Sequence, residues 1–346
     1  MKSRDIATLV LFSVFSSISV AQMVYTIPPD KFPSQQDFDN NHAAVVNIDM
    51  LNQLSDSFLD IDLNDATINV LGSFFPPDRS TYRSGVFVVN GRLGAEPGDT
   101  EFVDTQIRLQ SGMMDRDTVL RGTSSMKITG GTFLEDFSAY DASRLEVYSG
   151  TFYPDQGAYF AGESVFEIFG GTVSSLYILF GQDQARCIVR GGSIRQMSWI
   201  DGFDLVQIFG GVWDEIYLGK EICIDSAVLE IEGSCFAVEG VRIESVVGEP
   251  IEFSGSQLLQ AVSVVLPNQT PFRTLVMNQS GTVIFIPTGK PCVSDFDCSA
   301  SLDFFDISIF VDKFVEQDQI ADLDGDGDFD FFDISIFVNG FAQGCS

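Results

Sequence analysis

Near its C-terminus the chain carries a run of acidic residues with the spacing of metal ligands. From Asp322 to Asp330 every second residue is an aspartate, Asp333 closes the run, and Gly327 is its sixth residue. Calcium requires a shell of oxygen ligands, with a glycine where the loop turns sharply. The pattern predicts a calcium site rather than an ordinary acidic surface loop. Its expected ligands are Asp322, Asp324, Asp326, Asp328 (by its backbone carbonyl), Asp330 (directly or through water) and Asp333.

A second, weaker loop lies upstream. Asp303–Val311 recurs letter for letter as Asp330–Val338. In the loop ahead of the first copy, serine replaces the carboxylate at position 5 and Ala300 replaces the glycine at position 6. We therefore expect a lower calcium affinity there, and whether this loop is occupied stays open. Its candidate ligands are Asp295, Asp297, Ser299, Ser301 and Asp306.

Two loops, each followed by one helix and preceded by none, form a pattern that resembles a type I dockerin over residues 292–345. It is most similar to the variant that ends in a Gly-Cys pair, here Gly344 and Cys345, in secreted planctomycete proteins. Both loops end in Asp rather than the Glu usual in calcium-sensor EF-hands. The resemblance implies binding to a cohesin-like domain on a scaffold or surface protein.

In this family, loop positions 10 and 11 recognise the partner. The resemblance therefore implies partner contacts for Phe304, Phe305, Phe331 and Phe332. These rings imply a more apolar cohesin surface than usual, and the alternative is that some of them pack the module's small core. Because the two copies match, either helix is able to engage the partner.

So small a module often needs covalent or metal staples. Calcium is one. Cys292 and Cys345 lie near the two ends of the module and are the first candidates for a disulfide, with Cys298–Cys345 as the competing pair.

The N-terminus predicts export, which would allow disulfides to form. Lys2 and Arg4 precede a mostly apolar, uncharged stretch over 6–20, and Ser19-Val20-Ala21 supplies small residues for cleavage. The stretch is short for a membrane span, which needs about 20 residues. We expect 1–21 to be a signal peptide rather than an anchor, and the mature chain to be secreted or associated with the cell surface without membrane insertion.

Composition narrows the partners. The chain has 19 Lys and Arg against 49 Asp and Glu, a formal charge of −30. Such a surface repels nucleic acid and anionic membranes. The single histidine, His42, leaves little room for a His-based metal site or a Ser-His-Asp triad.

The middle of the chain repeats one phrase, seen most clearly in Met126–Phe133, Leu145–Phe152 and Phe166–Val173. An apolar-polar-apolar stretch indicates a strand with one buried face, and the small residues after it, usually Gly-Gly, allow a corner. Recurrence every 18 to 23 residues predicts a right-handed parallel β-helix of about ten coils rather than an antiparallel sandwich. The copies begin at Ile68, Val86, Ile107, Met126, Leu145, Phe166, Cys187, Val206, Leu229 and Ile251. Cys187 occupies an inward position and is interpreted as a small buried hydrophobe.

One outward column reads Tyr148, Phe169, Arg190, Phe209. It is either an exposed strip able to bind sugar rings or protein, or a simple stack of side chains along the solenoid, which we favour. A β-helix polysaccharide lyase or hydrolase would need acids, Arg or Lys clustered on one outer face. No position shows Asp-Asp or Asp-Asp-Arg recurring across adjacent coils, so no catalytic residue is assigned.

The chain thus divides into a signal peptide (1–21), an N-terminal cap (22–67), a β-solenoid (68–286), a linker (287–291) and a small all-α calcium-binding module (292–346). The fold class is mostly β. We expect a non-catalytic binding or structural arm displayed through the module; the alternative is a polysaccharide lyase or glycoside hydrolase recruited to a cellulosome-like complex.

Overall fold

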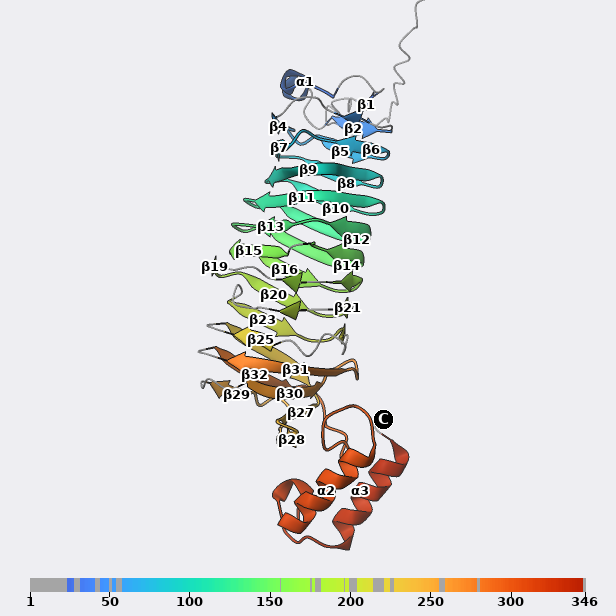
Figure 1. Ribbon diagram of the computed structural model, residues 1–346, viewed down its shortest axis with the longest axis vertical. Helices are drawn as coiled ribbons and strands as arrows, with labels where there is room; N and C mark the ends of the chain where they lie inside the picture. The colour runs from blue at the N-terminus through green and yellow to red at the C-terminus, as the bar shows by residue number, and fades with distance from the viewer. Residues whose placement is uncertain are drawn as a thin grey trace, which may run out of the picture.

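The computed structural model (Figure 1) describes residues 24–27, 32–40, 44–49, 52–53, 58–155, 157–174, 176–177, 182–195, 197–198, 204–213, 221–224, 227–254, 259–278 and 281–344. The expected signal peptide lies outside these residues. Within them, no helix is long and apolar enough to cross a membrane.

Most of the chain is a β-solenoid whose strands stack in parallel from turn to turn (Figure 1). The first face is the longest ladder: β1 (Val24–Ile27), β2 (Val45–Ile48), β5 (Thr67–Val70), β8 (Val86–Val89), β10 (Gln106–Leu109), β12 (Ser125–Leu134), β14 (Arg144–Tyr153), β16 (Val165–Ile168), β20 (Arg186–Val189), β23 (Leu205–Ile208), β26 (Val228–Gly233) and β32 (Thr282–Pro287).

Two further faces complete each turn. The second holds β3 (Asn52–Gln53), β6 (Ser73–Phe75), the first parts of β9 (Arg92–Val103) and β11 (Met113–Arg121), the ends of β12 and β14, β17 (Thr172–Val173), β21 (Ser193–Ile194) and β24 (Val212–Trp213). The third holds β4 (Phe58–Asp62), β7 (Arg79–Arg83), the ends of β9 and β11, β13 (Phe137–Ala139), β15 (Ala158–Gly162) and β19 (Gln182–Asp183). The short strands β18 (Leu176–Tyr177) and β22 (Met197–Ser198) pair with each other.

The solenoid has about seven turns rather than the ten coils expected over 68–286. Among the described residues, seven turns have a strand on all three faces, and the first-face ladder extends beyond them. The expected tenth copy at Ile251 is not a coil: β29 (Ile251–Ser254) runs antiparallel to β32. Nearby, a five-stranded sheet that includes antiparallel pairs closes this end. Its strands are β25 (Glu221–Ile224), β27 (Cys235–Val238), β28 (Val241–Arg242), β30 (Leu259–Val265) and β31 (Pro271–Asn278). At the other end, the ladder already includes β2, β3 and β4 of the segment expected to be a cap.

The second copy is shifted by one residue from its expected register. Ile68 pairs with Phe87, not Val86, and the buried residues of β8 are Phe87 and Val89. Val86-Phe-Val-Val89 is apolar at every position, so its sequence pattern does not distinguish the two faces. The first copy shows a similar slip: the phrase that begins at Ile68 ends with Phe75 as its inward eighth residue, yet Phe74 is buried and Phe75 only partly so.

The inward positions of the copies from Ile107 to Val206 form the predicted ladders. Phe133 and Phe152 are partners in the second-face ladder, with ring centroids 5.2 Å apart. Phe166, on the first face of the following turn, contacts Phe152 across the core at 5.6 Å. All three are fully buried, as is Cys187, which is a free thiol. The interpretation of Cys187 as a core residue is therefore confirmed.

The corner glycines are required by close approach of the chain between turns. Gly150 has a φ of +84°, and a Cβ added there would lie 2.6 Å from the carbonyl oxygen of Gly131 in the preceding turn. A side chain at this corner would force the two turns apart.

Helices occur at both ends. α1 (Gln35–Asn40) buries Phe38 against the solenoid core. At the C-terminus, α2 (Phe304–Glu316), a 3₁₀ turn (Gln319–Ala321) and α3 (Phe331–Gln343) form a separate small module (Figure 1). Phe310 of α2 and Phe337 of α3 stack with centroids 4.1 Å apart over Phe296. These rings form a core of the module's own.

Truncating one ring of the ladder tests the packing. Phe152→Ala removes a fully buried ring and is expected to lower the free energy of unfolding by about 3–5 kcal/mol. Tyr153→Ala, the next residue of β14, removes a ring that is 37% exposed and should lower it by less than about 1 kcal/mol. Denaturant titration of both variants measures the difference. Equal losses would contradict the ladder.

Candidate metal centre

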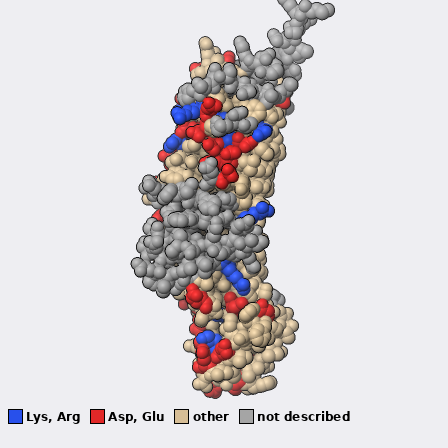
Figure 2. Space-filling model, in the orientation of Figure 1, with Lys and Arg blue, Asp and Glu red and all other residues tan. Residues whose placement is uncertain are grey.

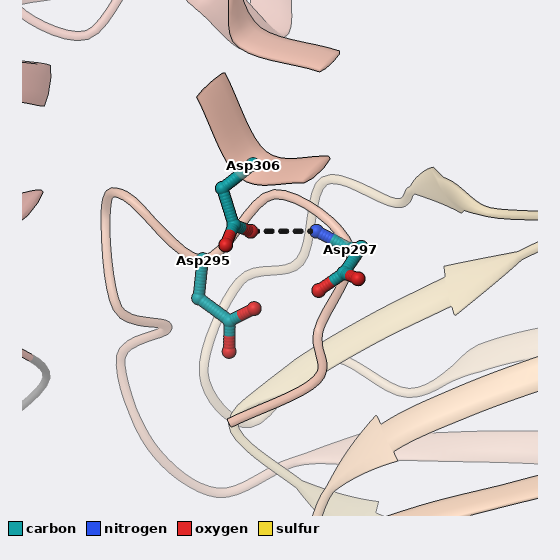
Figure 3. Close-up of side chains that lie close together, drawn as sticks. All are labelled: Asp295, Asp297 and Asp306. Atoms are coloured by element: carbon teal, nitrogen blue, oxygen red, sulfur yellow. Dashed lines mark hydrogen bonds between the residues drawn. The ribbon is translucent and has the colours of Figure 1, made fainter. Parts of the chain in front are cut away.

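Each C-terminal loop brings three carboxylates together. In loop 1 (295–306) they belong to Asp295, Asp297 and Asp306, and Figure 3 shows them facing one another. In loop 2 (322–333) the equivalent residues are Asp322, Asp324 and Asp333. Within each group, one carboxylate oxygen from each residue lies within 4.8 Å of the other two, so both clusters can hold a metal ion. They occupy positions 1, 3 and 12 of the expected loops.

Backbone N–H groups aim these carboxylates inward. In loop 2, Asp322 accepts hydrogen bonds from the N–H groups of Gly325 and Gly327, each at 2.9 Å. In loop 1, Asp295 accepts from the N–H of Ser299, at position 5 rather than 4, at 2.9 Å and from that of Ala300, at position 6 as in loop 2, at 3.0 Å. The sequence of each loop thus folds the chain around its own first aspartate.

The last aspartate of each loop joins it to the following helix. Asp306 accepts from the N–H groups of Phe296 at 2.7 Å and Asp303 at 2.9 Å, and Asp333 makes the same bonds with Leu323 and Asp330. Two loop aspartates have a role that was not predicted: Asp303 and Asp330 are the N-caps of α2 and α3, and each forms a capping box with the aspartate three residues on. The spacing Asp-x-x-Asp before an apolar helix was the available signal.

Backbone conformation separates the two loops. Positions 4 and 6 adopt positive φ in both. Loop 2 places Gly325 and Gly327 there, whereas loop 1 places Cys298 at +55° and Ala300 at +61°. A residue with a Cβ is strained in this region, so loop 1 needs support from its surroundings.

The three carboxylates of each loop are close enough to repel one another when all are ionised. Burial is the main cause that raises the pKa of Asp295, to about 6, and it also raises the pKa of Asp306. Desolvation and neighbouring carboxylates raise the pKa of Asp324. Burial acts in the same direction on Asp333, but hydrogen bonds from backbone N–H groups outweigh it and lower its pKa. The candidate metal ligands of both clusters are all oxygen atoms, which suits a hard divalent cation.

The other predicted ligands lie outside these groups of three. Ser299 Oγ donates to the carbonyl of Ser301 at 2.9 Å. Asp326 and Asp328 are exposed, and the carboxylate of Asp326 accepts from the N–H of Asp328 at 2.8 Å. One carboxylate oxygen of Asp330 accepts a hydrogen bond from the N–H of Phe332 at 2.7 Å. Their assignment as ligands stays a prediction.

The four loop phenylalanines are on the surface. Phe304 and Phe305 are 74% and 65% exposed, and Phe331 and Phe332 are 73% and 62% exposed. The alternative that they pack the module's core is wrong, because Phe296, Phe310 and Phe337 fill that position.

The disulfides differ in part from expectation. Cys298 is bonded to Cys235 of β27, so the competing Cys298–Cys345 pair is wrong. Spacing within the module could not reveal a partner 63 residues upstream. Cys292 is disulfide-bonded, while Cys345 lies outside the described residues, so their pairing stays a prediction.

The aromatic column is a continuous stack. Tyr148 and Phe169 stack face to face with centroids 4.5 Å apart, and the guanidinium of Arg190 lies 6.0 Å from the ring of Phe169 and 5.2 Å from that of Phe209. Ring faces that contact each other are not presented to a sugar, so the geometry favours side-chain stacking over a binding strip.

A carboxylate column on the third face was not found from the sequence. Asp99 and Asp117 are in register, and Asp136 donates its N–H to Asp117 at 3.2 Å from the next turn. Figure 2 shows acidic side chains gathered on the N-terminal half of the solenoid, with basic ones at the margins. Alignment on the first-face strand hid the column, because the β-bulge between Asp115 and Asp117 breaks the common spacing.

Burial, with Asp136 and Asp99 nearby, raises the pKa of Asp117. Burial and the surrounding carboxylates likewise raise the pKa of Glu135. Beneath them Arg116 is buried and donates to the carbonyl oxygens of Pro76 and Pro77. Both Asp117 and Glu135 therefore hold a proton more readily than a carboxyl group in water.

Comparison of the chain with protein-family models, with curated proteins and with solved structures finds no match.

Proposed function

We propose that residues 292–344 are a calcium-dependent docking module of the dockerin type, which attaches the secreted solenoid to a cohesin-like partner. One observation carries the proposal: the same unit occurs twice, and in each copy a three-carboxylate cluster precedes a helix whose first two residues are exposed phenylalanines. A large exposed apolar surface on a small module indicates a binding site.

Calcium has a clear physical part in this unit. Asp306 and Asp333 lie in the first turn of α2 and α3, next to the paired phenylalanines. A cation held between that aspartate and the rest of its loop offsets the repulsion among three carboxylates. It therefore fixes the start of the helix, and with it the phenylalanine pair.

The apolar surface continues along both helices. Val311 and Val315 of α2 are 49% and 76% exposed, and Val338 of α3 is 54% exposed. Aromatic residues, phenylalanine included, are enriched in protein interfaces relative to the rest of the surface. In this proposal the solenoid is a non-catalytic binding or structural arm that the module displays.

Calorimetric calcium titration tests whether the module binds calcium and whether loop 2 is its tightest site. The purified mature protein should bind calcium, and Asp322→Ala with Asp326→Ala should weaken its tightest site by at least about 100-fold, because two carboxylates leave the same loop. Asp204→Ala with Asp312→Ala removes equal charge from exposed positions outside the loops and should have little effect. Absence of calcium binding by the unmodified protein would end the proposal.

Partner binding is tested by surface plasmon resonance on a panel of purified cohesin domains in calcium. Because the two faces match, Phe304→Ala/Phe305→Ala and Phe331→Ala/Phe332→Ala should each retain binding. The fourfold variant should lose at least about 100-fold in affinity, as expected for removal of hot-spot residues. Leu71→Ala, on the solenoid surface, is the control. Equal binding by the fourfold variant would disprove the assigned face.

The carboxylate column favours a second candidate function, hydrolysis of a neutral polysaccharide. Strands of adjacent turns lie about 4.8 Å apart, so neighbouring and next-neighbouring carboxyls have separations close to those of retaining (about 5–5.5 Å) and inverting (about 6.5–9.5 Å) glycosidases. A general acid needs a raised pKa, as at Asp117. The negative surface disfavours polyuronate substrates.

This candidate predicts release of reducing ends from at least one neutral polysaccharide in a panel. Asp117→Asn should lower the rate at least about 1000-fold, because it removes the proposed acid. Asp204→Asn should not lower it. No release by the unmodified protein would eliminate the candidate.

A further inference from the structure

Loop 1 is attached to the end of the solenoid by contacts for which loop 2 has no counterpart among the described residues. The Cys235–Cys298 disulfide joins β27 to position 4 of loop 1. Position 4 of loop 2 is Gly325, against which a side chain would meet nothing within 4 Å. The two copies of the repeated unit therefore have different surroundings, although their helices begin with the same sequence.

A partly buried arginine of the closing sheet binds the backbone where loop 1 begins. Arg242 of β28 donates from Nη1 to the carbonyl oxygens of Cys292, Val293 and Asp295, at 3.3, 3.4 and 3.4 Å. Its guanidinium also lies 5.6 Å from the ring centre of Phe296, which belongs to the module's core. One side chain thus contacts both the loop backbone and that core.

A second arginine reaches an expected metal ligand. Nη2 of Arg273, on β31, lies 3.7 Å from Oδ2 of Asp297, at position 3 of loop 1. Among the described residues, no salt bridge reaches a carboxylate of loop 2. The solenoid therefore supplies loop 1 with a positive charge at a place where a calcium ion would compete for the same carboxylate.

Apolar packing contributes little to this junction. Its buried apolar cluster consists of Cys235, Ala237, Val265 and Cys298. Beside it lies a cavity of about 660 Å³, lined in part by Lys290, Ala300 and Gln343. The attachment therefore depends on the disulfide and the two arginines.

We propose that loop 1 is a joint that fastens the C-terminal module to the solenoid, and that Arg273 competes with calcium for Asp297. The serine at position 5 and alanine at position 6 agree with this, since both weaken a metal site that has gained another function. The covalent bond and the Arg242 contacts hold Cys298 and Ala300 in their strained conformation without a metal ion. The calcium part of this inference rests on the proposed function; the joint does not.

Hydrogen exchange in EDTA tests the joint. In the full chain with Cys235→Ser and Cys298→Ser, amides of residues 293–300 should exchange at least about tenfold faster than in the unmodified protein, because the loop opens more often. Amides of residues 322–330 are the internal control and should not change. Unchanged exchange in loop 1 would overturn the joint. Should this variant not fold, peptide mapping of the unmodified protein decides, since absence of a Cys235–Cys298 peptide would overturn it equally.

Calcium titration tests the competition, in a background with Asp322→Asn and Asp324→Asn so that loop 1 alone is observed. Arg273→Gln should raise the calcium affinity of loop 1 by about two- to fivefold, the range expected for a partly exposed ion pair. Arg186→Gln removes an equal charge from an exposed position of β20 and should leave the affinity unchanged. Equal affinities in the two variants would overturn the competition. If the unmodified protein binds no calcium, the proposed function fails, while exchange in EDTA still decides the joint.

Discussion

Hydrogen bonding between successive turns is the constraint on which the solenoid depends. A parallel ladder aligns each strand with the one before it, so residues of equal position stack in columns. Every column must then tolerate its own repetition. Phenylalanine does so inside, where Phe133 and Phe152 are partners in the ladder and their rings stack. Glycine does so at corners such as Gly150, where neighbouring backbones leave no room for a side chain.

Charged residues face the same constraint, because a column of like charges repels itself. On the first face the chain alternates signs: Glu146 pairs with Lys127 and Arg144, and Glu167 pairs with Arg144 and Arg190. With 19 basic residues for 49 acidic ones, such pairing cannot extend everywhere. The carboxylate column around Asp117 and the two C-terminal loops are places where acids gather. Both are therefore candidate sites for function, since clustered charge is unfavourable unless a ligand, cation or proton offsets it.

The sequence was most informative where one face is buried and the repeat is regular. The strands from Ile107 to Leu229 have the expected partners, and both acidic loops bring their first, third and last aspartates together. Prediction failed where the local sequence pattern does not determine strand register or contacts between distant segments. β8 is apolar at every position, so its pattern does not specify which residues face inward. The bulge between Asp115 and Asp117 shifts the spacing, so the carboxylate column is not visible in the aligned repeats. Cys298 forms its disulfide with a residue of β27 that is distant in the sequence. Ile251 fits the apolar pattern of the repeat but does not begin a coil, because its strand β29 lies antiparallel against β32, the last strand of the parallel ladder.

The covering of that end explains why the module is attached by one loop. A solenoid end exposes unpaired strand edges, which β29 and the closing sheet cover with antiparallel pairs. That same sheet carries Cys235, Arg242 and Arg273, the residues that contact loop 1. Yet Phe304 and Phe305 stay as exposed as Phe331 and Phe332. The solenoid thus contacts the back of the repeated unit and leaves both phenylalanine pairs open. In the proposed joint, attachment through one loop fixes the orientation of the module on the solenoid without covering either phenylalanine pair.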